Sequence, residues 1–368
     1  MKKTMLAVAV LGAFAGSAFA ADVTLYGRLD TSVVYTHTKD ANGVKTNSAS
    51  MESGWATGPR WGLKGAEDLG NNVKVGFVLE SGFSTDTGAM GQSRLFGRES
   101  TLYVASDYGT VYAGRMNTLL SDGGSMGMVG AMSAIGNSYG YATMKGSTGA
   151  AFARHDNLLG YVSPTFAGLK LAAQYSMKSD SVAVKDTVTQ ENKANADRYA
   201  AFGASYNYGN LNLVLAGDIN IYGHEAGEDV KDGWNVIFGG NYDFEVAKVF
   251  AKVAYFKDMR KIEDTLGFID VANHAKWRFK GYGLELGTNV PVLGGNVFGA
   301  VSYRDAKLQN GGEDVEGAKF KRWAGALGYT YAFSKRTNVY TAVNYVQEKA
   351  EGEKDQGAQF GVGLVHKF

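Results

Sequence analysis

The sequence lacks several features that would point to chemistry. Its 368 residues include no cysteine, which excludes a disulfide framework and a thiolate metal site, and only three prolines. The five histidines show no metal-ligand spacing, and neither a G-x-S-x-G motif nor a glycine-rich phosphate loop is present. The formal net charge of +1 gives no reason to expect a nucleic acid partner. These absences argue against an enzyme and predict no resident cofactor.

Long apolar runs are also absent after the first twenty residues, MKKTMLAVAVLGAFAGSAFA, so no transmembrane helix is expected. Those twenty residues have the parts of a secretory signal peptide: Lys2 and Lys3, an apolar stretch at 4–15 and a small-residue cleavage site at 18–20. The apolar stretch is too short for a membrane anchor. We therefore predict Sec-dependent export, with a signal peptide at 1–20 and one mature domain at 21–368.

What the chain does contain is glycine, tyrosine and alternation. There are 50 glycines and 21 tyrosines. In NLNLVLAGDINIY (210–222), Leu215 and Ile219 share one face, whereas Asp218 and Asn220 share the other. A period of two indicates β-strands. Many segments are about ten residues long, which is enough for a tilted strand to cross a bilayer.

The breaks between these segments are alternately short and long. The short ones carry the Gly, Asn, Asp and Pro of tight turns: 67–72, 106–110, 163–168, 207–210, 241–246, 289–295 and 331–336. The long ones are mostly polar and charged: 38–52, 84–93, 117–152, 178–196, 222–233, 259–275, 307–318 and 348–357. Seven turns and eight loops join sixteen strands and put both termini on the short-turn side.

This layout predicts an all-β fold, a 16-stranded antiparallel transmembrane barrel. In hydrocarbon every backbone N–H and C=O group must be hydrogen-bonded within the protein. The sheet must therefore close, and the last strand must pair with the first. Phe368 would then face lipid at the periplasmic interface, in an aromatic girdle with Tyr26 and Tyr161 near the same end. The alternative is a soluble β-sandwich or solenoid, which the signal peptide and the strand length disfavour.

A barrel of this size leaves an aqueous channel that something must narrow. The break at 117–152 is the longest, and it is rich in Gly, Ser, Ala and Met, with Asp122 as its acid and Lys145 as a base. This composition predicts a segment folded back into the barrel rather than an external loop, which remains the alternative. Alternation directs several charged residues into the lumen: Arg28, Asp30, Arg60, Lys64, Lys74, Glu80, Arg154 and Asp156.

Five segments resemble the general porins of the Gram-negative outer membrane, closest to the neisserial and betaproteobacterial type. They are VTLYGRLD (23–30), RWGLKGAEDLGNNVKVGFVLESGF (60–83), LFGRESTLYVASDYGTVYAGR (95–115), NLLGYVSPTFAGLKLAAQY (157–175) and FGVGLVHKF (360–368). The resemblance implies a homotrimer whose third long loop forms the constriction. It also implies that Phe368 belongs to a C-terminal signal read by the barrel-assembly machinery.

The resemblance further implies a ladder of arginines on the wall that faces the third loop, matched here by Arg60, Arg98 and Arg154. Arg115 and Lys64 are nearby candidates for the basic wall. Asp122, Glu80 and Asp30 are the candidates for the acidic side. Because this wall faces few acids, we expect a mild preference for anions.

The expected function is passive diffusion of small hydrophilic solutes and ions through an outer-membrane pore. Expected partners are a second and third copy of the chain, outer-membrane lipid, lipopolysaccharide and the assembly machinery. The acids Glu313, Asp314 and Glu316 are candidates for a loop-bound Ca²⁺, although such clusters are more often solvated loop tips. A substrate-specific channel, an outer-membrane enzyme and an adhesin remain alternatives.

Overall fold

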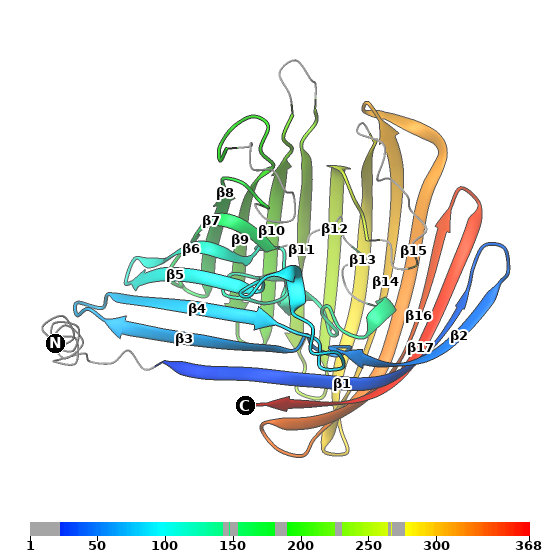
Figure 1. The fold of residues 1–368 in the computed structure, drawn as a ribbon, viewed down its shortest axis with the longest axis horizontal. Coiled ribbons are helices and arrows are strands. Elements are labelled where there is room, and N and C mark those ends of the chain that lie inside the picture. The colour runs from blue at the N-terminus through cyan, green and yellow to red at the C-terminus, as the bar shows by residue number, and fades with distance from the viewer. Residues whose placement is uncertain are drawn as a thin grey trace, which may run out of the picture.

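The computed structural model describes residues 23–142, 147, 154–180, 190–224, 230–263, 266 and 277–368. The predicted signal peptide lies outside the described residues. The described chain forms one antiparallel sheet and three short 3-10 turns (Figure 1). The strands are β1 (Thr24–Lys39), β2 (Lys45–Ser53), β3 (Arg60–Asp68), β4 (Lys74–Gly82), β5 (Glu99–Ser106), β6 (Gly109–Asn117), β7 (Arg154–Val162), β8 (Leu169–Ser176), β9 (Arg198–Tyr208), β10 (Leu211–Ile221), β11 (Gly233–Asp243), β12 (Lys248–Met259), β13 (Trp277–Val292), β14 (Gly295–Asn310), β15 (Glu313–Ala332), β16 (Thr337–Ala350) and β17 (Glu353–Lys367). The 3-10 turns are η1 (Gly91–Ser93), η2 (Val129–Met132) and η3 (Gly140–Ala142).

The sheet closes on itself, as predicted. Along the described chain consecutive strands pair with each other, except that β2 and β3 both pair with β1, and β17 pairs with β1 from Arg28 opposite Lys367 to Lys39 opposite Gln356. Gly27 and Phe368 extend this ladder by exchanging two backbone hydrogen bonds of 3.1 Å. Closure leaves no open edge, which is the condition for a sheet in hydrocarbon. Among the described residues, no helix is long and apolar enough to cross a membrane.

The barrel has sixteen strands, although seventeen segments are described, because β2 and β3 form one interrupted strand. The loop half of β1 pairs with β2 and its other half pairs with β3. Residues 54–59 leave the sheet between these halves. The strand count predicted from the sequence is therefore confirmed.

All seven predicted short turns connect consecutive strands at one end of the barrel (Figure 1). One of the two-residue turns, between β13 and β14, has Leu293 and Gly294 as its central residues, with φ of 50° and 75°. Two central residues with positive φ are typical of the type I′ turn, whose twist matches that of the flanking strands.

Three of the eight predicted loops are wrong. Residues 38–52, 307–318 and 348–357 are mostly strand, and the connections shrink to 40–44, 311–312 and 351–352. Beyond the apolar band of the outer wall these strands carry mostly polar side chains, so polarity there does not indicate a loop. Their inner face still places Leu308, Ala318 and Ala350 in a buried apolar cluster. The other five long connections are confirmed as breaks between strands, although parts of several lie outside the described residues.

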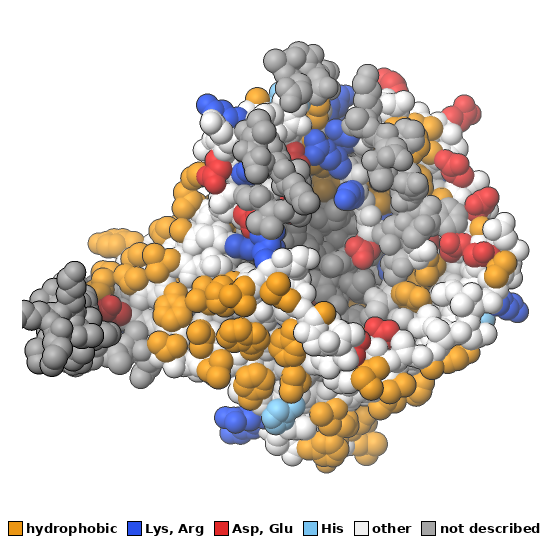
Figure 2. Space-filling view, in the orientation of Figure 1, with side chains coloured by type: hydrophobic (Ala, Val, Ile, Leu, Met, Phe, Trp, Pro, Cys, Tyr) orange, Lys and Arg blue, Asp and Glu red, His pale blue; other side chains and the backbone are white. Residues whose placement is uncertain are grey.

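The two faces of the wall differ as the alternation predicts. On β10, Leu215 and Ile219 are about half exposed on the outer face, whereas Asp218 is buried on the inner face. Hydrophobic side chains cover the outer face of β1 and β3–β5 in Figure 2. Tyr26 is an exception to the predicted girdle, because it points inward and its hydroxyl donates to Glu80.

Candidate pore constriction

The third long connection lies inside the barrel, which confirms the inward-folded loop. Its first half contributes Leu119, Val129 and Met132 to a buried cluster on the inner wall, where they pack with residues such as Tyr199 and Ile237. Its second half packs against the opposite wall in a second cluster of Ile135, Tyr139 and Ala142 with Phe298, Tyr340 and Val365. The described part of the loop therefore crosses the lumen. Burial raises the pKa of Tyr139, helped by the nearby Asp30 carboxylate.

Two buried carboxylates fasten this loop to the wall. The Glu99 carboxylate on β5 accepts hydrogen bonds from the hydroxyl and the backbone N–H of Ser125. On β13, Glu285 accepts from the Ser133 hydroxyl and lies 2.9 Å from Lys252 Nζ, with both side chains almost fully buried. These contacts fix the loop at two positions and leave its polar tip facing the remaining wall.

A second segment, residues 54–59, also turns into the barrel. Asp30 holds it by accepting from the backbone N–H groups of Ala56 (2.9 Å) and Thr57 (2.6 Å) and from the Tyr340 hydroxyl (2.7 Å). Trp55 packs edge-on against Tyr139, with ring centroids 5.6 Å apart. The constriction is therefore built from two inward segments. Sequence reasoning missed this one, although Gly54, Gly58 and Pro59 interrupt the strand pattern.

A polar cavity of about 270 Å³ lies between the two inward segments and the basic wall. The wall contributes Arg60, Arg98 and Arg154, and the third loop contributes Asp122. The remaining lining is polar or small: Gly54, Ala56, Thr57, Gly58, Asn117, Ser121, Asn137 and Ser138. The structure thus brings together the three ladder arginines and the loop acid that the sequence analysis singled out.

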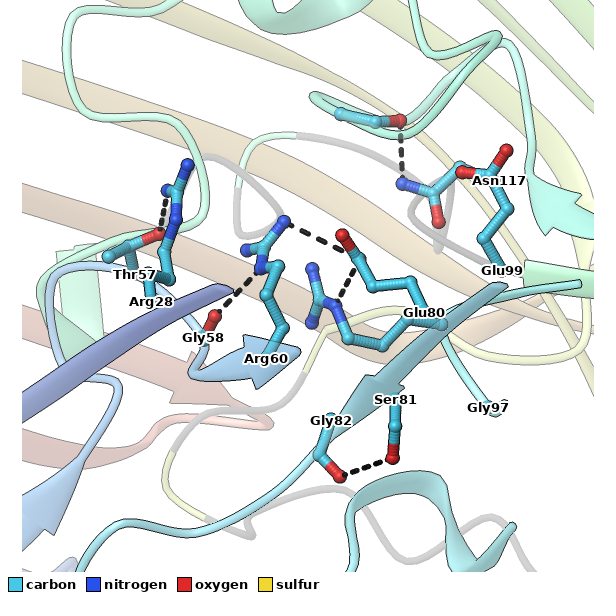
Figure 3. A network of polar contacts seen from close by, with 12 residues as sticks. Arg28, Thr57, Gly58, Arg60, Glu80, Ser81, Gly82, Gly97, Glu99 and Asn117 are labelled. Carbon is cyan, nitrogen blue, oxygen red and sulfur yellow. Dashed lines mark hydrogen bonds and ion pairs between the residues drawn. The ribbon is translucent and has the colours of Figure 1, made fainter. Parts of the chain in front are cut away.

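The arginines of the cavity are held differently, and Figure 3 shows Arg60 beside Gly58 and Glu80. Arg98 Nε donates to Glu80 Oε1 over 2.6 Å, and Arg60 Nη1 lies 3.6 Å from the same oxygen. Arg60 Nε also donates to the Gly58 carbonyl over 3.0 Å. Arg154 makes no ion pair with any described residue. Asp122 accepts from the backbone N–H and the side-chain amide of Asn137 (2.9 and 2.8 Å).

The other predicted site residues lie outside this cavity. Arg115 pairs with Asp156 over 2.7 Å, a carboxylate that it shares with Arg94. Lys64 is exposed, with its Nζ 5.4 Å from the centre of the Tyr26 ring. Asp30 is fully buried beneath the 54–59 segment.

Comparison with known proteins identifies the family. A profile of the Gram-negative porins matches residues 7–351. The chain belongs to this family. The porin is 33% identical to an outer membrane porin protein of Bordetella pertussis and 29% identical to outer membrane porin protein 32 of Delftia acidovorans, with full coverage of both chains in each case. Among solved structures, the anion-selective porin from Comamonas acidovorans aligns with a TM-score of 0.68 and 25% identity, covering 95% of this chain and 100% of that one. The protein is therefore an outer-membrane porin.

Phe368 of the porin lies outside the constriction, where β17 meets β1. A Cβ on Gly27 would lie 2.3 Å from Phe368 Cζ, so the ring occupies the place of the missing side chain. The ring is 46% exposed and is on the outer face. Phe368 thus lies on the outer face, as the alternation predicts, and its part in an assembly signal stays a prediction.

The porin also contains polar groups that sequence reasoning did not select for the constriction. Arg28 Nη1 donates to the Thr57 hydroxyl over 2.8 Å, and Glu99 anchors the third loop. For Glu99 a signal existed, because this acid follows Arg98 directly and lies opposite Glu80 on β4.

The acids considered for Ca²⁺ binding lie in β15 rather than in a loop. Asp314 is paired with Lys280 and Lys307. Within the described ranges, no group of three His, Asp or Glu side chains is placed to hold a metal ion.

Proposed function

We propose that this porin is a general diffusion pore with a mild preference for anions. The observation that carries the proposal is the polar cavity, where Arg60, Arg98 and Arg154 face a single loop acid, Asp122. Guanidinium groups remain charged at all physiological pH values. Rings of fixed charge in a narrow passage set the sign of the ions that pass.

The acids near the cavity do not cancel this positive field. Glu80 is shared between Arg98 and Arg60 and also accepts from the Tyr26 hydroxyl, so one carboxylate faces two guanidinium groups. Asp122 is oriented by Asn137 on the far side of the cavity. Charges in a passage walled by protein interact more strongly than in bulk water, so the excess of guanidinium groups favours anions.

Passage through such a pore needs no reaction. We propose passive diffusion of small hydrophilic solutes and ions, with the third loop and the 54–59 segment excluding larger ones. The similarity to a protein described as an anion-selective porin supports the same preference here. The stacked lumen aromatics that would favour a substrate-specific channel do not appear in the lining of the described cavity.

We further propose a homotrimer, exported by its signal peptide and inserted by the barrel-assembly machinery, with lipopolysaccharide around it. The family resemblance supports the trimer. A second support is the low wall made by β3–β8, whose strands have 8 or 9 residues, against 14 to 20 in β13–β16. Outward apolar side chains on this wall, such as Leu102 and Val104, suit contact with another subunit.

The test is the reversal potential of the refolded protein in a planar bilayer under a KCl gradient. We expect the wild type to favour chloride. The triple variant Arg60→Gln/Arg98→Gln/Arg154→Gln should lose this preference, because the excess of guanidinium groups is gone.

Arg336→Gln is the control, because Arg336 is exposed in the turn after β15, far along the chain from the cavity lining. It should leave the reversal potential unchanged. A potassium-favouring wild type, or a triple variant that selects like the wild type, would contradict the proposal.

A further inference from the structure

Lysines face one another across the outer surface at the loop end of the barrel. The strand register places them in two rows of directly opposite residues. Like charges in such cross-strand positions destabilise a sheet unless an anion lies between them. The rows, called the lysine patch below, are Lys280, Lys307 and Lys319 across β13–β15, and Lys321, Lys349 and Lys354 across β15–β17.

Two aspartates neutralise part of the lysine patch. Asp314 lies 2.5 Å from Lys280 Nζ and 3.4 Å from Lys307 Nζ, and Asp305 lies 3.5 Å from Lys321 Nζ. The other three lysines have no carboxylate within ion-pair distance in the part of the chain that the structure describes. The patch therefore keeps an excess of positive charge, and its lysines are exposed except for the half-buried Lys280.

An apolar groove of about 270 Å³ begins next to the lysine patch on the membrane side. Tyr303 and Trp323, directly opposite each other, are two residues from Asp305 and Lys321. The apolar part of the lining is Leu284, Leu286, Val301, Tyr303, Trp323 and Ala324. The order from water to membrane is therefore cations, then amphipathic aromatics, then an apolar groove.

Gly325 leaves room beside this groove. It lies opposite Val301 and shares the outer face with Trp323, yet a Cβ there would meet nothing nearer than 3.4 Å. Close packing inside the protein therefore does not require this glycine. The open space faces the hydrocarbon, where only an apolar chain can fill it.

We propose that the lysine patch and the groove form one binding site for lipid A, the phosphorylated, multiply acylated saccharolipid of lipopolysaccharide. The patch is on the long-loop side of a Gram-negative outer-membrane barrel, and the outer leaflet there supplies such lipids. The lysines bind the headgroup phosphates, and one acyl chain lies in the groove beneath Tyr303 and Trp323. Free phosphate would satisfy the lysines but would leave the groove empty. The site rests on the outer-membrane location and not on the proposed anion preference.

The first arm of the test measures binding of diphosphoryl lipid A to the refolded full-length barrel in detergent micelles by titration calorimetry. Lys319→Gln/Lys321→Gln/Lys349→Gln should bind roughly 100-fold more weakly, since each lysine at an anionic lipid surface contributes about fivefold. The matched control, Lys74→Gln/Lys335→Gln/Lys367→Gln, removes three lysines at the other end of the barrel and should bind like the wild type. Equal affinity of the patch variant and the wild type, or no binding by the wild type, would overturn the proposal.

The second arm tests the groove. Gly325→Ile should weaken lipid A binding several-fold, while Ala204→Ile, which adds bulk to the outer face of β9 away from the groove, should not. If inorganic phosphate at the same concentration displaces lipid A, the acyl chain adds nothing to binding. That result would overturn the proposal that the groove holds an acyl chain. If the wild type binds no lipid A and Gly325→Ile dissociates the oligomer, this face is instead an interface with a second copy of the chain. That outcome would overturn the proposed lipid site.

Every variant is also checked for the heat-modifiable barrel band on a denaturing gel and for its reversal potential. We expect both to match the wild type, because none of these residues lines the constriction. Failure of the lipid site and failure of the anion preference are therefore read from different measurements.

Discussion

At the scale of single residues, the arginines of the constriction separate into two kinds. Arg60 and Arg98 share the Glu80 carboxylate, so they contribute to stability as well as to the field in the pore. Arg154 makes no ion pair in the described chain, and its Nε is buried without a hydrogen-bond partner there. A buried guanidinium group without an ion pair contributes little to stability. A role in ion passage therefore explains Arg154 better than a role in folding.

This difference gives a prediction about two matched variants. Arg154→Gln should reduce the chloride preference while the free energy of unfolding stays within about 0.5 kcal/mol of the wild type or rises. Arg98→Gln should reduce the chloride preference and also cost about 1–3 kcal/mol, because Glu80 loses its shortest charged contact. Guanidinium unfolding in micelles, followed by tryptophan fluorescence, measures the difference. Equal losses of stability in the two variants would contradict it.

At the scale of elements, the third loop holds its position through a few buried contacts. Its apolar side chains pack on both walls, but Glu285 with Lys252 and Ser133 forms the polar anchor on β12 and β13. Breaking a buried ion pair leaves a charge without its counter-ion, whereas replacing both partners by apolar residues is often neutral. The loop should therefore keep its position when both charged residues are present or both are replaced, and lose it when only one of the two is replaced.

We accordingly predict that Glu285→Gln destabilises the barrel by about 3–5 kcal/mol, because the Lys252 ammonium stays buried without that carboxylate. The double variant Lys252→Met/Glu285→Met should recover most of this loss. The same unfolding measurement tests both, and single-channel records should show more frequent closures for Glu285→Gln. A single variant as stable as the wild type, with quiet channels, would show that the ion pair does not hold the loop.

At the scale of the whole molecule, much of the fold could be predicted because a barrel repeats one simple pattern. Alternation indicates which face a residue occupies, and tight turns have their own chemistry, so sixteen strands and seven turns were predicted correctly. Alternation does not indicate depth, so three hairpins that extend into water were read as loops. Depth also decides the constriction: Arg60, Arg98 and Arg154 meet at one level, whereas Lys64 and Arg115 do not. The break at 54–59 has a signal in its glycines and proline, but its inward turn could not be predicted, because it depends on Asp30 from another strand.

Closure of the barrel depends on the contact between its first and last strands, and this contact can be tested at Gly27. The Phe368 ring fills the space of the missing side chain, and the Arg60 carbonyl lies 2.8 Å from the position of a Cβ. Gly27→Val should therefore reduce the yield of closed barrel, seen as loss of the heat-modifiable band after refolding. Gly299→Val is the control, because that glycine also faces outward and a Cβ there would meet nothing nearer than 3.6 Å. If both variants refold like the wild type, the seam tolerates bulk at Gly27 and the ring of Phe368 is not required to seal it.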